Sequence, residues 1–356
     1  MSLPNHGANP QHVYNSLGIM PPSRIIDFSE NVNPLGPPDS IQSAWHNFHQ
    51  FMKVYPDPVG EPFRTKIAQY HNISPDSIFV SNGASEVFSL LAEKYMGKRA
   101  ILVHPTFSEY DTTLKARHVE IVNLKMPNIV TGELPIADMK EHMHHADVLY
   151  LCTPNNPTGT LPKRSVIREL IQYAKISNCD IVLDEAFIDF ISEEASFISD
   201  IYSAHVIIVR SMTKMYAMPG LRLGYMAAAP HIVEEIQRLA PHWNVNRLAA
   251  EVGSLVLNDE TFRKKAIQHS LKTCKDMTAF LKAQGCEVTQ SQANFLLFKL
   301  PQLNKGFFPY FLRKGIVLRH TENFRELDGQ WFRIGMKSEA QMEILKRELT
   351  GWFEAH

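Results

Sequence analysis

The sequence of 356 residues contains no long apolar run. No stretch approaches the about 20 residues that a membrane-spanning helix needs, and the amino terminus lacks the basic start and apolar stretch of a signal peptide. Charge of one sign is not in excess either, since 36 Lys and Arg residues balance 37 Asp and Glu residues. A near-neutral chain has no basic footprint for nucleic acid or for an anionic membrane. We therefore expect neither kind of partner.

Cysteine is also scarce. The chain has four cysteines and no C-x-x-C spacing among Cys152, Cys179, Cys274 and Cys286. This scatter is typical of reduced, mostly buried thiols in a cytoplasmic protein. The histidine-rich stretch "EHMHH" (141–145) lies in a polar segment, where a solvated helix face is the simpler interpretation. We expect a cytoplasmic protein that holds no metal.

What the chain does contain is a repeated alternation from about residue 78. Short apolar, mostly β-branched runs alternate with longer helical segments; the runs are "SIFVS", "RAILVHP", "VEIVNL", "ADVLYLCTP", "CDIVLDEAF" and "HVIIVRS". Strands that alternate with helices predict a parallel sheet layered between helices. Ligands of such sheets bind at the carboxyl ends of the strands.

The pattern changes after "LGYMAAAP" (223–230), where long helical segments and then three strand-like runs follow. We predict an amino-terminal arm or substrate loop over 1–35, a large domain over 36–245 and a smaller α+β domain over 246–356. The Pro-rich start has no convincing core pattern, so we expect it to wrap over a surface or over a neighbouring subunit.

Two polar turns follow predicted strands. "SNGASE" (81–86) opens a helix, and the free backbone N–H groups of Gly83, Ala84 and Ser85 suit a phosphate. An ordinary capping turn explains the same residues. "CTPNNPTG" (152–159) places two asparagines between prolines, which makes a rigid turn that can aim amides into a cleft, or simply a tight turn.

Two charged residues lie in apolar surroundings. Asp184 ends the strand "IVLDEAF" and needs a partner, which a helix cap or a salt bridge could also supply. Lys214 lies in "VRSMTKMYAMPGLRLGY" (209–225), where desolvation would lower its pKa and give a free amine that attacks carbonyls. A lysine that extends to the surface is the alternative. Ser211, Thr213 and Arg222 flank it and could each hold a phosphate oxygen.

The spacing S-x-T-K-x-x-x-x-x-G-x-R-x-G around Lys214 resembles the pyridoxal-phosphate lysine motif of class I aminotransferases. "PNNPTG" and an Asp about 30 residues before the lysine resemble other landmarks of that family. The resemblance covers essentially the whole chain. It implies an α/β protein of fold type I: a large domain with a mainly parallel seven-stranded sheet between helices, plus a small α+β carboxyl-terminal domain. It also implies pyridoxal 5'-phosphate as cofactor and a homodimer with shared sites.

The resemblance also implies a role for each matching residue. Lys214 forms the imine with the cofactor and later donates or accepts the proton, while Asp184 pairs with the protonated pyridine nitrogen. The other cofactor residues are Asn156 on the phenolic oxygen, Phe107 stacked on the ring, Ala84, Ser85, Ser211 and Arg222 on the phosphate, and Tyr55 reaching that phosphate from the partner subunit.

Two arginines are left for the substrate. Arg333 lies in the strand-like "WFRIGM" and Arg319 ends "GIVLR". A planar guanidinium suits bidentate capture of carboxylate or phosphate, although an inter-domain salt bridge is the alternative. By resemblance, Arg333 receives the substrate carboxylate and Arg319 a substrate phosphate.

Within this family, the chain resembles the threonine-phosphate decarboxylases more than the histidinol-phosphate aminotransferases. "NHGANPQHVYNSLGI" followed by "IIDFSENVNPLGPP" is similar to the opening of the decarboxylases, and so is the wording around Lys214. Phe187 stands where the aminotransferases place a tyrosine that donates to the phenolic oxygen, a bond that phenylalanine cannot make. Ala8 departs from the usual glycine of this opening.

The resemblance thus implies decarboxylation of a small phosphorylated amino acid, O-phospho-L-threonine. His6, Gly7, Asn31 and Asn156 are expected around the substrate together with both arginines. A histidinol-phosphate aminotransferase and a phosphoserine-preferring decarboxylase are the alternatives within the family. A non-catalytic, regulatory protein of the same fold is the alternative outside catalysis.

Overall fold

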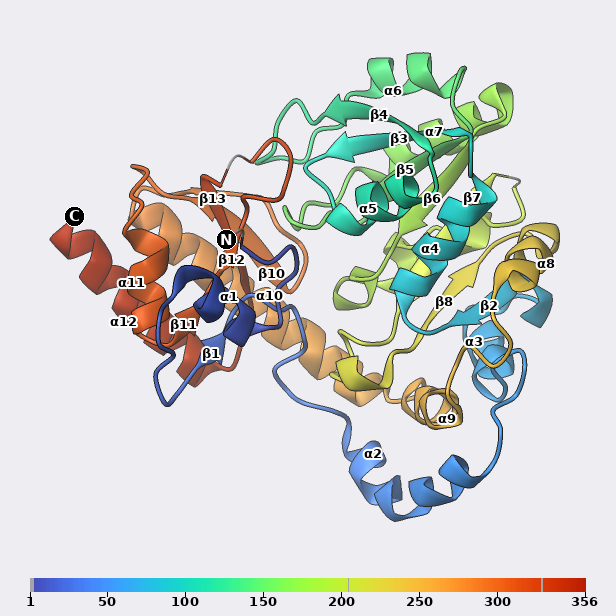
Figure 1. The fold of residues 1–356 in the computed structure, drawn as a ribbon, viewed down its shortest axis with the longest axis horizontal. Helices are drawn as coiled ribbons and strands as arrows, with labels where there is room; N and C mark the ends of the chain where they lie inside the picture. The colour runs from blue at the N-terminus through green and yellow to red at the C-terminus, as the bar shows by residue number, and fades with distance from the viewer. Residues whose placement is uncertain (1–2, 204, 328) are drawn as a thin grey trace.

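The computed structural model describes residues 3–203, 205–327 and 329–356 (Figure 1). Strands in these ranges form a seven-stranded sheet, a four-stranded sheet and a two-stranded sheet. The large sheet and its helices make one domain, and the two small sheets belong to a second domain beside it.

The strand order of the large sheet is β2-β8-β7-β6-β5-β3-β4. Its strands are β2 Ile78–Ser81, β3 Arg99–His104, β4 Glu120–Lys125, β5 Val148–Cys152, β6 Asp180–Asp184, β7 Val206–Ser211 and β8 Gly224–Ala227. β8 pairs antiparallel with both β2 and β7, and the other pairings are parallel. The carboxyl ends of the other six strands therefore meet at one edge, and the predicted mainly parallel sheet is confirmed.

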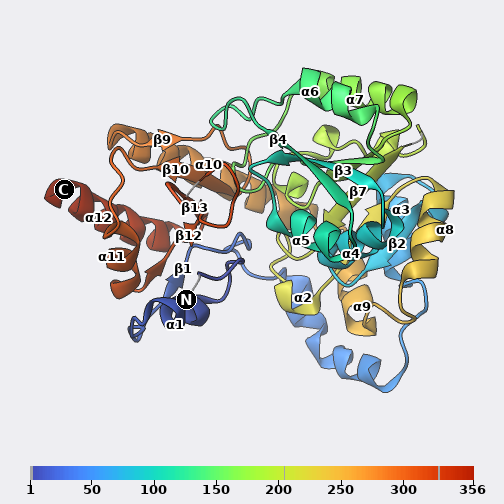
Figure 2. The same ribbon diagram turned by 45° about the horizontal axis from the view of Figure 1, so that its top comes forward.

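Helices cover both faces of this sheet (Figure 2). On one face, Leu102 and Tyr150 pack with α4 Ala84–Lys94, α5 Ser108–Ala116 and α8 Pro230–Leu239. On the other face, Ile101 and Leu149 pack with α3 Phe63–His71, α6 Ile136–Met143, α7 Arg164–Ser177 and α9 Arg247–Val256. Because both faces are covered, the strands are apolar along their whole length, which is why they stood out in the sequence.

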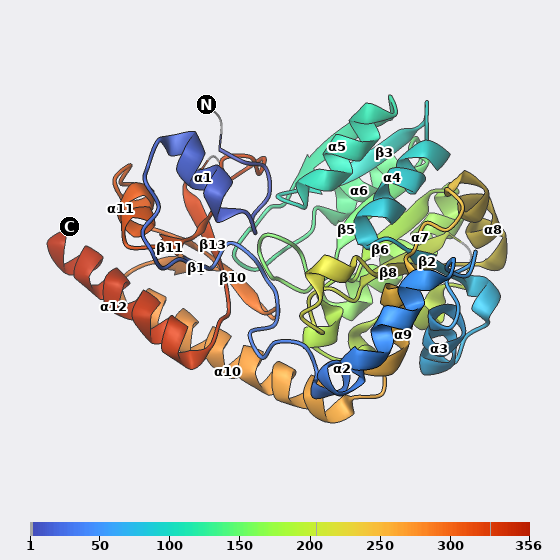
Figure 3. The ribbon, with the colours of Figure 1, turned by 60° about the horizontal axis from the view of Figure 1, so that its bottom comes forward.

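The small domain is built on the sheet β12-β13-β10-β9. Its strands are β9 Glu287–Val288, β10 Phe295–Lys299, β12 Arg319–His320 and β13 Trp331–Gly335, and its helices include α11 Phe307–Arg313 and α12 Glu339–Ala355. The long helix α10, Glu260–Ala283, runs from one domain to the other (Figure 3). Ala266 packs in the core of the large sheet and Met277 in the core of the small domain. The core of the large sheet therefore extends past residue 245, the predicted boundary.

The amino-terminal segment contributes to the core of the small domain. α1 Pro10–Leu17 buries Tyr14, whose hydroxyl donates to the carbonyl of Leu312 at 2.8 Å. β1 Ile26–Asp27 pairs parallel with β11 Ile316–Val317, and Phe28 beside it is fully buried. Residues 10–28, which precede the Pro-rich stretches, therefore supply apolar side chains to the core. The sequence showed no such pattern because α1 and β1 are too short for a clear period.

Shorter elements complete the chain. α2 is Asp39–Ala44, and the 3₁₀ helices are Trp45–Lys53, Pro75–Ser77, Ile188–Phe190, Glu193–Ala195, Ile198–Asp200 and Pro219–Leu221.

A buried ionic cluster lies on the α10 side of the sheet. Arg210, in β7, is 1% exposed and donates to Glu185 at 3.0 Å, Asp189 at 2.9 Å and Glu193 at 2.8 Å. Arg263, in α10, reaches Glu193 at 3.1 Å. Glu185 follows Asp184 directly and Arg210 precedes Ser211, so the cluster fixes the two strand ends that carry the predicted site.

We predict that Arg210→Met lowers the free energy of unfolding by about 3–5 kcal/mol, because it leaves Glu185 buried and unpaired. The measurement is the midpoint of urea unfolding. Arg238→Met is the matched control, since Arg238 makes an exposed pair with Glu234 one helical turn away and should change stability by less than about 0.5 kcal/mol. Equal midpoints for the two variants would contradict the prediction.

Candidate active site

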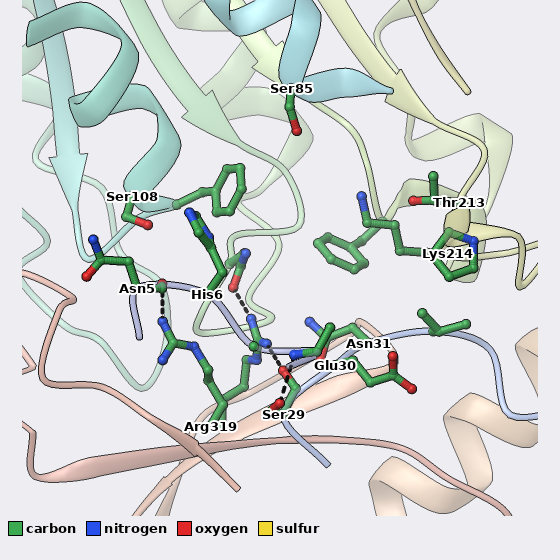
Figure 4. Close-up of a pocket in the computed structure, with 18 of the residues that line it drawn as sticks. Asn5, His6, Ser29, Glu30, Asn31, Ser85, Ser108, Thr213, Lys214 and Arg319 are labelled. Carbon is green, nitrogen blue, oxygen red and sulfur yellow. Dashed lines mark hydrogen bonds between the residues drawn. The ribbon is translucent and has the colours of Figure 1, made fainter. Parts of the chain in front are cut away.

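The carboxyl edge of the large sheet opens onto a cavity of about 260 Å³ between the two domains. Loops that follow β2, β3, β5, β6 and β7 supply one side of the cavity, and the small domain with the amino-terminal arm supplies the other. Figure 4 shows Lys214 and Thr213 on one side, Ser85 above and Arg319 below, with His6 between them. The parallel sheet therefore gathers these residues where the sequence predicted a ligand site.

Lys214 enters the cavity three residues after β7. Its Nζ donates to Ser211 Oγ at 2.9 Å and lies 5.5 Å from the centre of the Phe187 ring. Burial lowers the pKa of Lys214 to about 8, an effect that the carboxylate of Asp184 opposes and that Arg222 reinforces. The amine is therefore partly unprotonated near neutral pH, as a nucleophile for an aldehyde must be.

Asp184 ends β6 and is 4% exposed. Its Oδ1 accepts from the amide of Ala186 at 2.9 Å, and its Oδ2 accepts a short hydrogen bond from the hydroxyl of Tyr110. Burial raises the pKa of Asp184, while Tyr110 and Lys214 lower it. No motif in the sequence points to a role for Tyr110.

A phosphate-sized corner lies at the start of α4. The amides of Ala84 and Ser85 open this helix and have no partner within it. Gly83 has φ +75°, and a Cβ on it would lie 2.6 Å from Nη2 of Arg222. Only glycine lets this guanidinium approach the helix start so closely. Arg222 makes no ion pair among the described residues and leaves its charge for an anion.

Asn156 is oriented by Arg333. Nη1 of Arg333 donates to Oδ1 of Asn156 at 2.6 Å, and its Nη2 donates to the carbonyl of Ser29 at 2.6 Å. Arginine has no acceptor, so the oxygen of the amide must face it and the Nδ2 group is left to donate. Asn156 lines the cavity. It is therefore set up to donate to an acceptor such as a phenolate oxygen.

Arg319 and Arg333 lie opposite each other in register on β12 and β13. Both are buried, at 3% and 6% exposed, and neither pairs with a carboxylate among the described residues. Burial lowers the pKa of Arg319 to about 10 and that of Arg333 to about 9, where the charge of Arg319 adds to the effect. Two like charges across one strand pair are unfavourable without an anion between or beside them.

The amino-terminal arm closes the side of the cavity next to Arg319. Arg319 Nη2 donates to the carbonyl of Asn5 at 2.5 Å, and the amide of Ala8 donates to Ser29 Oγ at 3.0 Å. A Cβ on Gly7 would lie 2.3 Å from the carbonyl oxygen of Ser29, so glycine is required there. His6 of the arm lies 3.4 Å from the carboxylate of Glu109 in α5. Ala8, which replaces the usual glycine, has φ +66°.

Twelve of the predicted residues line the cavity together: His6, Gly7, Asn31, Ser85, Phe107, Asn156, Phe187, Thr213, Lys214, Arg222, Arg319 and Arg333. Four further predicted residues do not line it but interact with or adjoin residues that do: Gly83 lies against Arg222, Ala84 precedes Ser85, Ser211 accepts from Lys214, and the charge of Asp184 acts on Lys214. Tyr55 does not line it; it is 79% exposed and packs on Trp243 with a ring separation of 5.1 Å.

Several lining residues were not predicted. Asn5, Ser29, Glu30, Val32, Ser108 and Phe324 also line the cavity. Ser29 holds Arg333 through its backbone carbonyl and Ala8 through its hydroxyl. A backbone contact of this kind leaves no residue-type signal in a sequence.

The residues present fit pyridoxal phosphate. The cavity offers a buried amine at Lys214, a buried carboxylate behind it at Asp184 and the ring of Phe107 in its wall. Because Gly83 has no Cβ, the guanidinium of Arg222 lies close to the start of α4. Its charge and the free amides of the helix start can together bind a phosphate. Asn156 supplies a donor for the phenolic oxygen.

Other classes of site find no support in the described part of the chain. Its helices include none that is both long and apolar enough to cross a membrane. No group of three or more His, Cys, Asp or Glu residues there is arranged to hold a metal ion. The four cysteines are buried and form no disulfide.

Comparisons with known proteins agree with this geometry. The family model described as aminotransferase class I and II matches residues 23–349. A threonine-phosphate decarboxylase of Salmonella typhimurium is 33% identical over 354 residues, which cover 97% of each chain.

Two solved structures share the fold. The histidinol-phosphate aminotransferase from Clostridium acetobutylicum superposes with a TM-score of 0.87 at 27% identity, and L-threonine-O-3-phosphate decarboxylase from Porphyromonas gingivalis with 0.82 at 26%. Each covers 92% of this chain and 99% of its own.

The lowered pKa of Lys214 predicts a pH-dependent stability difference. Below pH 8 the folded protein without cofactor carries the desolvated ammonium of Lys214, which lowers its free energy of unfolding. This destabilisation disappears as the pH rises from about 8 to 10.5. We therefore expect Lys214→Met to be more stable than the original protein at pH 7, by up to about 2 kcal/mol, because cavity water screens part of the cost. The advantage should shrink toward pH 10.5.

The measurement is urea unfolding of the cofactor-free proteins between pH 7 and 10.5. Lys264→Met is the control, because Lys264 is exposed and pairs only with Glu260 on the same helix. If Lys214→Met were more stable than the original protein by the same amount over this whole range, the result would count against a lowered pKa of Lys214.

Proposed function

This chain belongs to the aminotransferase class I and II family, whose members bind pyridoxal phosphate, and we propose that it decarboxylates O-phospho-L-threonine. The products would be CO₂ and (R)-1-aminopropan-2-yl phosphate, the precursor of the aminopropanol side chain of cobalamin. The threonine-phosphate decarboxylase that covers 97% of this chain supports the proposal.

The observation that carries the proposal is the pair of buried arginines in register. Arg319 and Arg333 place two guanidinium groups on one side of the cavity, with no carboxylate partner among the described residues. Phosphothreonine has two anionic groups, a carboxylate and a phosphate, separated by a short carbon chain. Each arginine can hold one of them, and the favourable interaction offsets the repulsion between the two cations.

When bound, pyridoxal phosphate supplies a conjugated ring that accepts the electron pair of a bond broken at the substrate α-carbon. The residues of this chain decide which bond breaks, because only the bond perpendicular to that ring can deliver its electrons. In our proposal Arg333 holds the carboxylate and Arg319, with His6 and Asn31, holds the phosphate. These two anchors fix the rotation about the bond between the α-carbon and its nitrogen. Lys214 then delivers a proton to the α-carbon after CO₂ leaves.

Histidinol-phosphate aminotransferase is the second candidate, favoured by the structural likeness to the Clostridium acetobutylicum enzyme. Two features of this chain count against it. Phe187 cannot donate to the phenolic oxygen, and its ring lies 5.5 Å from Nζ of Lys214. The arm also fills the space beside Arg319, which leaves room for a short substrate. A phosphoserine-preferring decarboxylase would use the same anchors.

We also propose that the chain forms a homodimer in which Tyr55 completes the site of the partner subunit. Tyr55 is far more exposed than an aromatic side chain normally is, at 79%. Other large apolar side chains near it in sequence or in space are also exposed: Trp45, Met52, Val54 and Trp243. An exposed cluster of this kind is typical of a protein interface.

The decarboxylase proposal is tested by incubating the purified protein with pyridoxal phosphate and phosphothreonine and measuring CO₂ release. We expect release, and we expect Arg319→Lys and Arg333→Lys to lower kcat/KM by about 10- to 100-fold, because lysine cannot make the bidentate bond. Arg313→Lys, at the exposed end of α11, should have no effect.

Phosphoserine is the parallel substrate in this assay. A higher kcat/KM for phosphoserine would move the assignment to that substrate. Glutamate formation from histidinol phosphate and 2-oxoglutarate, without CO₂ release from phosphothreonine, would replace the proposal by the aminotransferase.

The shared site is tested by mixing two inactive variants, Tyr55→Ala and Lys214→Ala, after joint unfolding and refolding. In a mixed dimer one site has an intact Lys214 and receives an intact Tyr55, so about a quarter of the original activity should return. Each variant refolded alone is the control. If Tyr55 served the site of its own subunit, mixing would restore no activity, and if it served no site, Tyr55→Ala refolded alone would be active.

A further inference from the structure

Tyr110 is the buried group beside the cofactor residues that no predicted role accounts for. It lies in the first turn of α5, three residues after Phe107, and is fully buried. Its ring packs edge-on against Phe107 at 5.6 Å and against Phe88 at 4.8 Å. One helix start therefore carries both an aromatic ring that lines the cavity and a phenol that reaches Asp184 at the end of β6.

The phenol of Tyr110 contacts the carboxylate of Asp184. Its hydroxyl donates to Oδ2 of Asp184 in a short hydrogen bond, while the amide of Ala186 donates to Oδ1 at 2.9 Å. The two donors hold both carboxylate oxygens and so fix the plane of the carboxylate. A carboxylate has about four lone-pair positions, so it can still accept a third hydrogen bond.

Tyr110 also stabilises the charge of Asp184. Burial raises the pKa of Asp184, and the hydrogen bond from Tyr110 is the first of the interactions that lower it, followed by the charge of Lys214. Burial and the nearby carboxylate raise the pKa of Tyr110 well above its ordinary value, so the phenol keeps its proton. The other titratable group that faces Asp184 is Cys152, from β5, and burial raises the pKa of its thiol too. Neither neighbour can therefore add a negative charge near neutral pH.

We propose that Tyr110 is a positioning residue that keeps Asp184 ionised and aimed, and thereby keeps the ring nitrogen of the bound cofactor protonated. Without this hydrogen bond the pKa of Asp184 would rise, and its carboxylate would compete with the ring nitrogen for the proton. A ring nitrogen that loses its proton attracts electrons less strongly. The proposal rests on pyridoxal phosphate as cofactor and is independent of whether the reaction is decarboxylation or transamination.

The chain offers a matched control in the same aromatic cluster. Tyr150, in β5, is 1% exposed, and its ring centre lies 5.4 Å from that of Tyr110. Its hydroxyl is buried and has no hydrogen-bond partner among the described residues. Tyr150→Phe therefore removes the same atom from the same layer without touching Asp184.

The experiment reconstitutes Tyr110→Phe, Tyr150→Phe and the unmodified protein with pyridoxal phosphate labelled with ¹⁵N at the ring nitrogen. The ¹⁵N chemical shift reports directly whether that nitrogen is protonated, whatever the activity. We expect the pyridinium shift in the unmodified protein and in Tyr150→Phe. The shift of Tyr110→Phe should move toward that of unprotonated pyridine. This variant should also bind the cofactor about tenfold more weakly, because an Asp184 that is less fully ionised makes a weaker charged hydrogen bond to the ring nitrogen.

A pyridinium shift and unchanged cofactor affinity in Tyr110→Phe would overturn the proposal. If Tyr110→Phe fails to fold, 3-fluorotyrosine at position 110 replaces it, since this residue keeps the shape and is a stronger donor. We then expect tighter cofactor binding with the pyridinium shift retained. Unchanged or weaker binding by a folded 3-fluorotyrosine protein would equally overturn the proposal.

Discussion

The site depends on one constraint: a carboxylate and an amine are both withdrawn from water at the carboxyl edge of a parallel sheet. Burial raises the pKa of Asp184 and lowers that of Lys214 to about 8. Each shift brings the group closer to exchanging protons near neutral pH, which neither would do on the surface. The sheet makes this possible because β6 and β7 are neighbours and their ends are covered on both faces.

On the small-domain side of the cavity, arginines make the contacts that hold the neighbouring groups in place. Arg333 orients the amide of Asn156 and holds the backbone of Ser29, and Arg319 holds the arm through Asn5. The small domain therefore presents cations and donors to a cavity whose other wall carries the catalytic amine. In our proposal this division lets the large domain bind the cofactor while the small domain, with the arm, selects the substrate. Arg210 and Arg263 tie the large-domain end of α10 to β7 through the carboxylate of Glu193.

Much of this could be predicted from the sequence, and the failures have physical reasons. The parallel strands were predictable because both of their faces are buried, which makes them continuously apolar. β8 was not predicted, because its four residues, Gly224–Ala227, are too few to show a period and strand direction leaves no trace in composition. The amino-terminal contribution to the small core was missed because Tyr14 and Phe28 lie in elements too short to show a period.

The same limits apply to the site. Residues that follow the strand ends were predictable because the topology converges there; those that line one cavity are Ser85, Phe107, Asn156, Phe187, Thr213, Lys214 and Arg222. Tyr110 was not, because its partner Asp184 is 74 residues away and an aromatic residue in a helix is usually core. Ser29 acts through its carbonyl and hydroxyl on groups that are distant in the chain, which no residue pattern records.

The route of the amino-terminal arm has a practical consequence for handling the protein. His6 and Gly7 line the cavity, whereas α12 ends the chain on the far side of the small domain (Figure 1). An affinity tag fused ahead of the arm would lie close to the cavity that His6, Gly7 and Arg319 line. A tag on the carboxyl terminus would be remote from it, and is the sounder choice for purification and kinetic work.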